Sequence, residues 1–212
     1  MQVTVYAGSA KGNSEVYARA AEEFAGELAQ AGVGIVYGGG SVGLMGVVAD
    51  AALREGGRVT GVIPQSLAAA EIAHPSLTSL HVVGSMSERK ELLANFGDCY
   101  VALPGGLGTL EEIFEVWASL ILGHHRKPVM LLNVDGYWDS LLSTVGQVAQ
   151  AGFMRLDESE SLIAITSAGE LFEVLATWEP PPPRWKKKVT SSGSPDRQSA
   201  IPLKAMTLST AP

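Results

Sequence analysis

The sequence predicts an α/β protein in which a doubly wound, mainly parallel open sheet carries helices on both faces. Short strand-like runs alternate with helical patterns over the first 179 residues, as in repeated βαβ units. The strand-like runs are apolar throughout, which is typical of parallel strands that are buried on both sides. Loops rich in glycine or small polar residues follow three of these runs, and ligands bind beyond the carboxyl ends of the strands in such sheets.

Each expected element follows from its own residue pattern. Runs rich in β-branched, aromatic and other apolar residues predict strands over 3–7, 34–37, 59–63, 99–103 and 129–133. Apolar residues at helical spacing predict helices over 15–29, 44–54, 88–95, 110–122 and 138–151.

Composition and charge separate a globular part from a tail. The chain has 212 residues, 46% of them hydrophobic, and a run of four prolines at 180–183 closes the patterned region. We expect one domain over 1–179 and a flexible, Pro- and Ser-rich basic tail over 180–212. The tail holds six Lys or Arg residues against one Asp, whereas the domain has a net charge of −12, which disfavours nucleic acid as a partner. The basic run at 184–188 suits either solubility or an anionic partner, and no function is assigned to it.

Several classes of protein and site are excluded by composition. The single cysteine, Cys99, leaves no intramolecular disulfide framework and no cysteine zinc cage. No apolar run approaches the roughly 18 to 20 residues of a membrane span, and the amino terminus lacks the pattern of a signal peptide. We therefore expect a cytoplasmic protein with no membrane partner. The four histidines lack metal-ligand spacing, and we predict no metal and no cofactor.

Three loops at the expected ligand-binding edge are rich in glycine or small polar residues, namely 7–14, 37–46 and 103–109. Glycine lets backbone N–H groups approach a ligand closely, and the helix after each loop presents unpaired donors to an anion. The sequence therefore favours a phosphate-bearing ligand.

Gly38, Gly40 and Gly43 also spell G-x-G-x-x-G, the pattern of dinucleotide-binding proteins. The next strand runs into Pro64 without the acidic residue that would hold a ribose hydroxyl, and the pattern follows the second strand instead of the first. NAD binding is therefore the weaker alternative. None of the three loops ends in Gly-Lys-Ser/Thr, which excludes a P-loop.

Glu112 lies in the helix after the third loop and has two interpretations. Thr109 and Glu112 have the spacing of a capping box, in which the carboxylate would accept the N–H of Thr109, and the pattern alone favours this interpretation. Alternatively, Glu112 lies one turn inside a helix whose amino terminus points at the strand ends, and its carboxylate faces the ligand.

Arg89 and Lys90 lie in the first turns of the helix that Ser85 or Ser87 can cap, where the helix dipole disfavours cations. A bound anion or a facing carboxylate would offset that cost. A surface salt bridge to a neighbouring glutamate is the other interpretation.

Five segments together resemble the LOG ("Lonely Guy") family: 38–40, 42–46, 61–64, 88–90 and, most specifically, Pro104-Gly-Gly-Leu-Gly-Thr-Leu-Glu-Glu112. The similarity covers nearly all of residues 1–178. The resemblance implies a Rossmann-like fold and a homodimer with active sites at or near the subunit interface. It also implies cytokinin riboside 5'-monophosphate phosphoribohydrolase activity, in which an N6-modified adenosine monophosphate, or AMP in many bacterial members, is hydrolysed to free base and ribose 5-phosphate. The family's older lysine decarboxylase label lacks support here, because no lysine has a recognisable pyridoxal phosphate context.

The resemblance also implies residue roles. Arg89 and Glu112 match the family's catalytic arginine and glutamate. The implied substrate contacts are Glu71, Arg89, Lys90, Gly105, Gly106, Leu107, Gly108, Thr109, Leu110, Glu111 and Glu112. Ser87 and Ala118 depart from the family pattern, Ala118 standing where the family often has a substrate-contacting threonine. The preferred base therefore stays open among isopentenyl-adenine, another N6-substituted adenine and adenine.

The residue chemistry agrees with this activity. Cleavage of a ribose–adenine bond passes through an oxocarbenium-like state, which a fixed anion beside the sugar stabilises. Glu112 suits that role because a helix amino terminus favours its ionised form, and the amides of 105–109 suit the 5'-phosphate. A non-catalytic nucleotide or molybdenum cofactor carrier of similar fold is the alternative. Such a carrier needs no carboxylate beside the sugar, so Arg89 and Glu112 together favour the enzyme.

Overall fold

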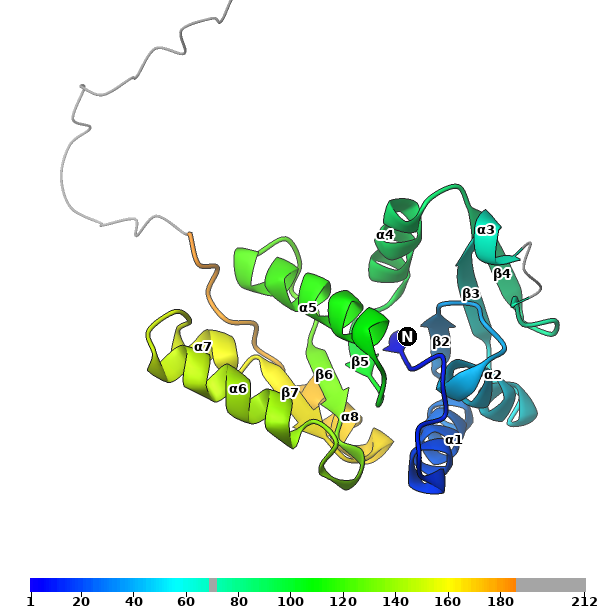
Figure 1. The fold of residues 1–212 in the computed structure, drawn as a ribbon, viewed down its shortest axis with the longest axis horizontal. Helices are drawn as coiled ribbons and strands as arrows, with labels where there is room; N and C mark the ends of the chain where they lie inside the picture. The colour runs from blue at the N-terminus through cyan, green and yellow to red at the C-terminus, as the bar shows by residue number, and fades with distance from the viewer. Residues whose placement is uncertain (69–71, 186–212) are drawn as a thin grey trace, which may run out of the picture.

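The computed structural model describes residues 1–68 and 72–185, and it is built on one seven-stranded, all-parallel sheet (Figure 1). The strands are β1 (Gln2–Tyr6), β2 (Gly34–Tyr37), β3 (Val59–Pro64), β4 (Ser79–Val83), β5 (Cys99–Ala102), β6 (Val129–Leu132) and β7 (Leu162–Ile165). Their order in the sheet is β4-β3-β2-β1-β5-β6-β7. The winding direction changes between β1 and β5, and this switch point is where doubly wound sheets bind ligands. The predicted fold class is confirmed.

Helices cover both faces of the sheet. On one face lie α1 (Glu15–Gln30), α2 (Gly43–Arg54) and α8 (Ala168–Thr177), and on the other lie α4 (Met86–Phe96), α5 (Leu107–Leu122) and α6 (Asp139–Gln150). Three short elements complete the described chain: α3 (Gln65–Ala68), the 3-10 turn η1 (Val134–Gly136) and α7 (Leu156–Ser159). Within residues 1–68 and 72–185, no helix combines the length and the apolar character needed to cross a bilayer.

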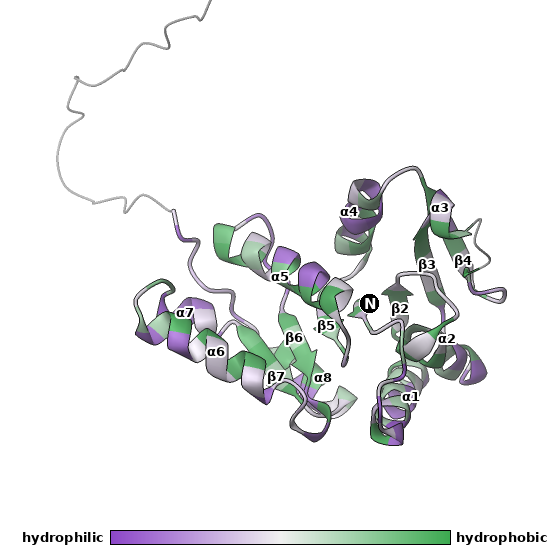
Figure 2. Ribbon diagram, in the orientation of Figure 1, coloured by the Kyte–Doolittle hydropathy of each residue, from purple (hydrophilic) through white to green (hydrophobic). Residues whose placement is uncertain are grey.

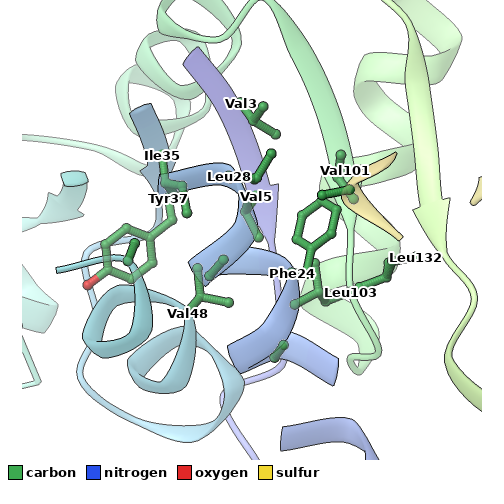
Figure 3. Packing of buried hydrophobic residues seen from close by; sticks show 14 of the residues in the cluster. Val3, Val5, Phe24, Leu28, Ile35, Tyr37, Val48, Val101, Leu103 and Leu132 are labelled. Atoms are coloured by element: carbon green, nitrogen blue, oxygen red, sulfur yellow. The ribbon is translucent and has the colours of Figure 1, made fainter. Parts of the chain in front are cut away.

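The core consists of two apolar layers, one on each side of the sheet. The strands are hydrophobic along most of their length, whereas the helices alternate polar and apolar faces (Figure 2). On one side, Phe24 and Leu28 of α1 and Val48 of α2 pack against strand side chains such as Val5 and Val101 (Figure 3). Each of these five residues is at most 2% exposed. Burial on both faces explains why the central strands show no polar alternation.

The two edge strands are the part of the sheet that the sequence pattern missed. The five predicted strands correspond to β1, β2, β3, β5 and β6, which form the interior of the sheet. β4 and β7 are its edges. The middle of β4 is exposed and includes His81, so it lacks the continuous apolar run that identifies a buried strand.

Three loops at the carboxyl edge are joined at Gly8. Its N–H donates to the carbonyl oxygen of Pro104 at 3.2 Å, and its own carbonyl accepts the N–H of Leu44, at the start of α2, at 2.9 Å. Gly43 has a φ of 61°, and a Cβ there would collide with the backbone of Ser9. The loops after β1, β2 and β5 are therefore held together as one unit.

The end of the described chain folds back onto the domain. The N–H of Arg184 donates to the carbonyl oxygen of Ile121 in α5 at 3.1 Å. Its guanidinium lies 3.8 Å from the buried carboxylate of Glu158 and donates to the carbonyl oxygen of Phe153 at 3.3 Å. The segment expected as a flexible tail thus begins with residues that contact the domain. Residues 186–212, with most of its basic run, lie outside the described residues.

We expect Gly43→Ala to destabilise the protein more than Gly32→Ala. Both glycines have positive φ, 61° and 73°, so alanine is strained at either position by about 1 kcal/mol. Only at Gly43 would the new Cβ also meet the first loop, whereas the space around Gly32 is open. The overlap should cost roughly 1–3 kcal/mol more in the free energy of unfolding, measured by urea denaturation. Equal losses would show that the joined loops are not tightly packed.

Candidate active site

The start of α5 decides the role of Glu112. The helix begins at Leu107, three residues earlier than predicted, and its N-cap is Gly106. The capping box between Thr109 and Glu112 is therefore wrong, because Thr109 lies inside the first turn and not at the cap. No side chain caps this helix, so the N–H groups of its first turn and the positive end of its dipole are available to an anion.

Glu112 pairs instead with Arg89 of α4. The Nη1 of Arg89 donates to the Oε1 of Glu112 at 2.6 Å, and its Nε donates to the carbonyl oxygen of Val62, in β3, at 3.2 Å. The two side chains are only 12% and 11% exposed. The facing carboxylate that would offset a cation at the start of α4 is therefore present.

Local contacts direct Arg89 toward the site. Ser85 caps α4 by accepting the N–H of Glu88, whose carboxylate accepts the N–H of Gly84. The Glu88 carboxylate is thus engaged by the backbone just before the helix, while the Arg89 guanidinium pairs with Glu112, so the alternative of a surface salt bridge from Arg89 to Glu88 or Glu91 is wrong. A Cβ at Gly38 would collide with the Arg89 guanidinium, so the glycine leaves room for it at the end of β2.

Lys90 forms a second connection between α4 and α5. Its Nζ lies 2.6 Å from the carboxylate of Glu111 and 2.9 Å from that of Glu115. The hydrogen bonds to Glu111 and Glu115 raise the pKa of Lys90. Lys90 and Arg89 are adjacent in sequence, and together they fix the two helices beside each other.

Burial controls the electrostatics of the pair. It raises the pKa of Glu112, while the charge and the hydrogen bond of Arg89 oppose that rise. Arg89 is therefore the main group that favours the carboxylate form of Glu112 against burial. Burial and the charge of Glu112 also raise the pKa of Tyr6, which keeps its phenol neutral. Tyr6 and Glu112 line a cavity of about 480 Å³ between α4 and α5.

The implied substrate-contacting residues fall into distinct places. Arg89, Lys90, Glu111 and Glu112 meet through the two ion-pair contacts described above. The remaining residues of the motif surround the start of α5, and they are Gly105, Gly106, Leu107, Gly108, Thr109 and Leu110. Glu71 lies outside the described residues.

The two departures from the family pattern lie on different sides of α5. Ser87 lines the 480 Å³ cavity that also includes Glu112. Ala118 lies in an apolar groove between α5 and α6, together with Phe114, Trp117 and Leu141. Ala118 therefore does not share a cavity with Glu112 of its own chain.

A second cavity, of about 370 Å³, lies between the first and third loops. Ser9, Lys11, Gly105 and Tyr137 are among its lining residues. Tyr137 was not identified from the sequence, because the loop after β6 is not rich in glycine. Its position in the loop that follows a parallel strand, at the edge where ligands bind in such sheets, is the signal that could have found it.

His74 takes a structural position in the fold. His74 is buried, and its Nε2 lies 3.0 Å from the Oδ1 of Asp50. The backbone N–H of His74 donates to the carbonyl oxygen of Gly39 at 2.9 Å, which holds the loop after β2 in place. No group of three His, Cys, Asp or Glu side chains that could hold a metal ion occurs among the described residues.

The open parallel sheet, with glycine-rich loops at its switch point, defines a Rossmann-like α/β protein, a class whose members bind ligands at the strand ends. A family model described as "Possible lysine decarboxylase" matches residues 45–175. The cytokinin riboside 5'-monophosphate phosphoribohydrolase LOG of Oryza sativa subsp. japonica is 42% identical over 204 residues, covering 94% of this chain and 84% of that protein. The LOG5 protein of Arabidopsis thaliana, with the same enzyme name, is 42% identical over 179 residues, covering 84% and 78%. The chain belongs to the LOG family of cytokinin riboside 5'-monophosphate phosphoribohydrolases.

Solved structures share the fold at lower identity. The molybdenum cofactor binding protein of Rippkaea orientalis superposes with a TM-score of 0.62 at 22% identity, covering 82% of this chain and 94% of that one. The molybdenum cofactor carrier protein of Chlamydomonas reinhardtii gives 0.62 at 20% identity, covering 83% and 98%. These similarities establish the architecture of the sheet.

We expect Arg89→Met to lower the free energy of unfolding by about 3 kcal/mol near neutral pH, because it leaves the Glu112 carboxylate buried without its partner. The substitution also removes the group that lowers the pKa of Glu112, so this carboxyl group will titrate at higher pH than before. A raised pKa in the folded state means that the penalty grows as pH rises and shrinks as Glu112 becomes protonated. Urea denaturation between pH 5 and 8 measures this dependence.

The double variant Arg89→Met/Glu112→Gln provides the control. It should recover most of the lost stability at neutral pH, because no buried charge remains. A penalty that is independent of pH and additive between the two positions would contradict the ion pair.

Proposed function

We propose that this chain hydrolyses the N-glycosidic bond of cytokinin riboside 5'-monophosphates, and of AMP, to the free base and ribose 5-phosphate. The observation that carries this assignment is the nearly buried Arg89–Glu112 pair, which lies one turn below the uncapped start of α5. Relatives named for this activity, with 42% identity over most of the chain, support it. No cofactor is part of the reaction.

The two ends of the substrate match two features of α5. The first-turn N–H groups suit the 5'-phosphate, because they are uncapped and lie at the positive end of the helix dipole. Glu112 lies about four residues further along α5, which corresponds to a rise of about 6 Å along the helix axis from this first turn. That separation suits a ribose whose phosphate is held at the helix end and whose anomeric carbon lies beside the Glu112 carboxylate.

Glu112 then acts where positive charge develops. As the bond from C1' to the base nitrogen breaks, its electron pair leaves with the base, which takes up a proton from solvent water, and the sugar becomes oxocarbenium-like. The carboxylate stabilises this cation, and it can accept a proton from the water that adds to C1'. Because the site is nearly buried, this electrostatic stabilisation is stronger than it would be in water.

Arg89 is the group that makes this role possible. Burial alone raises the pKa of Glu112 and so favours the neutral acid, which would not stabilise a cation. The 2.6 Å contact with Arg89 favours the charged form and fixes the position of the carboxylate. A carrier of nucleotide or molybdenum cofactor would bind phosphate at the same helix end, but it would have no use for this pair.

A homodimer is part of the proposed assembly. The groove between α5 and α6 has a volume of about 320 Å³, and its lining, which includes Phe114, Ala118 and Ile121, is almost entirely apolar. An apolar groove of this kind, with Phe114 exposed at its edge, is typical of a surface that another subunit covers. A second copy seated there would bring Ala118 near a neighbouring site, consistent with the position of the family's substrate-contacting threonine. We also infer a cytoplasmic location, where nucleoside monophosphates are available.

We expect the purified protein to release free base from AMP and from isopentenyladenosine monophosphate. Glu112→Gln should lower kcat at least about 100-fold, because the amide keeps the shape of the side chain but cannot supply the negative charge. Chromatography of the free base, with ribose 5-phosphate as the second product, measures both. Tight nucleotide binding without base release by the unmodified protein would favour a carrier instead.

We expect the unmodified chain to sediment as a dimer and Phe114→Glu to sediment as a monomer. The added carboxylate would be buried without a partner at the edge of the apolar groove. Val82→Glu is the matched control, since Val82 is also an exposed apolar residue but lies on edge strand β4. Dissociation by both substitutions, or by neither, would show that the groove is not the dimer surface.

A further inference from the structure

We propose that Tyr137 positions the phosphate-binding turn, so that the uncapped N–H groups of α5 face the substrate. This inference rests on the proposed function, and it adds a residue from the loop after β6 to the site. Its basis is a hydrogen bond of 2.7 Å, in which the Tyr137 hydroxyl donates to the carbonyl oxygen of Gly105, next to the N-cap of α5.

Tyr137 is held in place by aromatic contacts. Its ring lies edge-on to Tyr17 of α1, with 5.6 Å between centroids, and edge-on to Trp138, with 4.7 Å between centroids. Trp138 is 3% exposed, whereas Tyr137 is 39% exposed and lines the 370 Å³ cavity. The hydroxyl therefore comes from a ring supported by the domain, at the rim of the cavity.

The turn that carries Tyr137 adopts a costly backbone conformation. Asp135 has a φ of 50°, and it is the one non-glycine residue with positive φ in the described part of the chain. Gly136 follows with a φ of 70°. The side chain of Asn133 fastens the turn, because its Nδ2 donates to the Oδ1 of Asp139 at 2.7 Å and its Oδ1 accepts the N–H of Trp138 at 2.8 Å. Such strain persists where the surrounding contacts fix it, and it is concentrated at ligand-binding sites.

The hydrogen bond has a clear electrostatic consequence. A carbonyl oxygen that faced the phosphate would repel it, since both carry negative charge. The carbonyl of Pro104 is already engaged by the N–H of Gly8, and that of Gly105 is engaged by Tyr137. Both carbonyls before the N-cap are thus occupied, and the N–H groups at the start of α5 are left for the anion.

Packing shows that this turn tolerates little movement. A Cβ at Gly105 would collide with the side chain of Thr109 and approach the backbone of Gly8. Tyr137 therefore holds the turn from the cavity side, while Gly8 and Thr109 confine it from the other sides. A turn confined in this way presents its donors without rearrangement when the phosphate binds.

The test is Tyr137→Phe, which removes the hydroxyl and keeps the ring. We expect the KM for AMP to rise about tenfold and kcat to change less than about twofold, because one hydrogen bond that orders a binding turn is lost. The Kd for ribose 5-phosphate, measured by calorimetry, should rise by a similar factor. Hydrolysis of adenosine, which has no phosphate, should keep its kcat/KM. A merely structural role would change all of these together.

Trp178→Phe is the matched control, because the Trp178 indole N–H also donates to a backbone carbonyl, that of Arg126 at 2.7 Å, but at the amino end of β6 and so at the opposite edge of the sheet. It should leave the Kd for ribose 5-phosphate unchanged.

The role of Tyr137 is overturned if Tyr137→Phe leaves the Kd for ribose 5-phosphate unchanged, or if it lowers kcat/KM for adenosine as much as for AMP. In either case the proposed function still stands if the unmodified protein releases free base. If the unmodified protein released no base, the proposed function would fail, and ribose 5-phosphate binding would still decide the role of Tyr137. Failure of the unmodified protein to bind ribose 5-phosphate would overturn both the phosphate site and the role of Tyr137.

Discussion

The ion pair between Arg89 and Glu112 is the interaction on which the arrangement of the site depends. It joins α4 to α5 at the carboxyl edge of the sheet, with both side chains nearly buried. Neither residue would be stable there alone, because a buried charge without a partner is strongly destabilising. The pair therefore fixes the two helices and keeps a carboxylate in a place where burial would otherwise favour its neutral form.

The rest of the fold supplies a rigid frame for this pair. The loops after β1, β2 and β5 meet at Gly8, next to the switch point of the sheet. Glycine allows the backbones to approach there, and it leaves room for the Arg89 guanidinium at Gly38. The uncapped start of α5 and the Glu112 carboxylate thus lie a few residues apart along this helix, which is the spacing that the proposed nucleoside monophosphate substrate requires.

Much of the fold could be predicted because the interior strands are buried on both faces and so remain apolar throughout. The edge strand β4 lacks that signal, because it contains Ser79 and the exposed His81, whereas β7 (Leu162–Ile165) is apolar throughout but only four residues long. The capping interpretation of Thr109 and Glu112 failed because glycine at position 106 starts α5 earlier than the apolar spacing indicates. The partnership of Arg89 with Glu112 joins residues 23 positions apart, and only their placement on adjacent helices brings them together. The role of Tyr137 could not be predicted from the sequence for a similar reason, since its hydroxyl donates to the carbonyl oxygen of Gly105, 32 positions earlier in the chain.

The most direct test of this account is a crystal structure of the Glu112→Gln variant with AMP, because the variant should bind the nucleotide without turning it over. We expect the phosphate on the N–H groups at the start of α5 and the C1' atom within about 4 Å of the Gln side chain that replaces Glu112, as a group that acts at that carbon requires. A nucleotide whose phosphate lies elsewhere, or whose sugar lies far from this side chain, would contradict the central role assigned to Glu112.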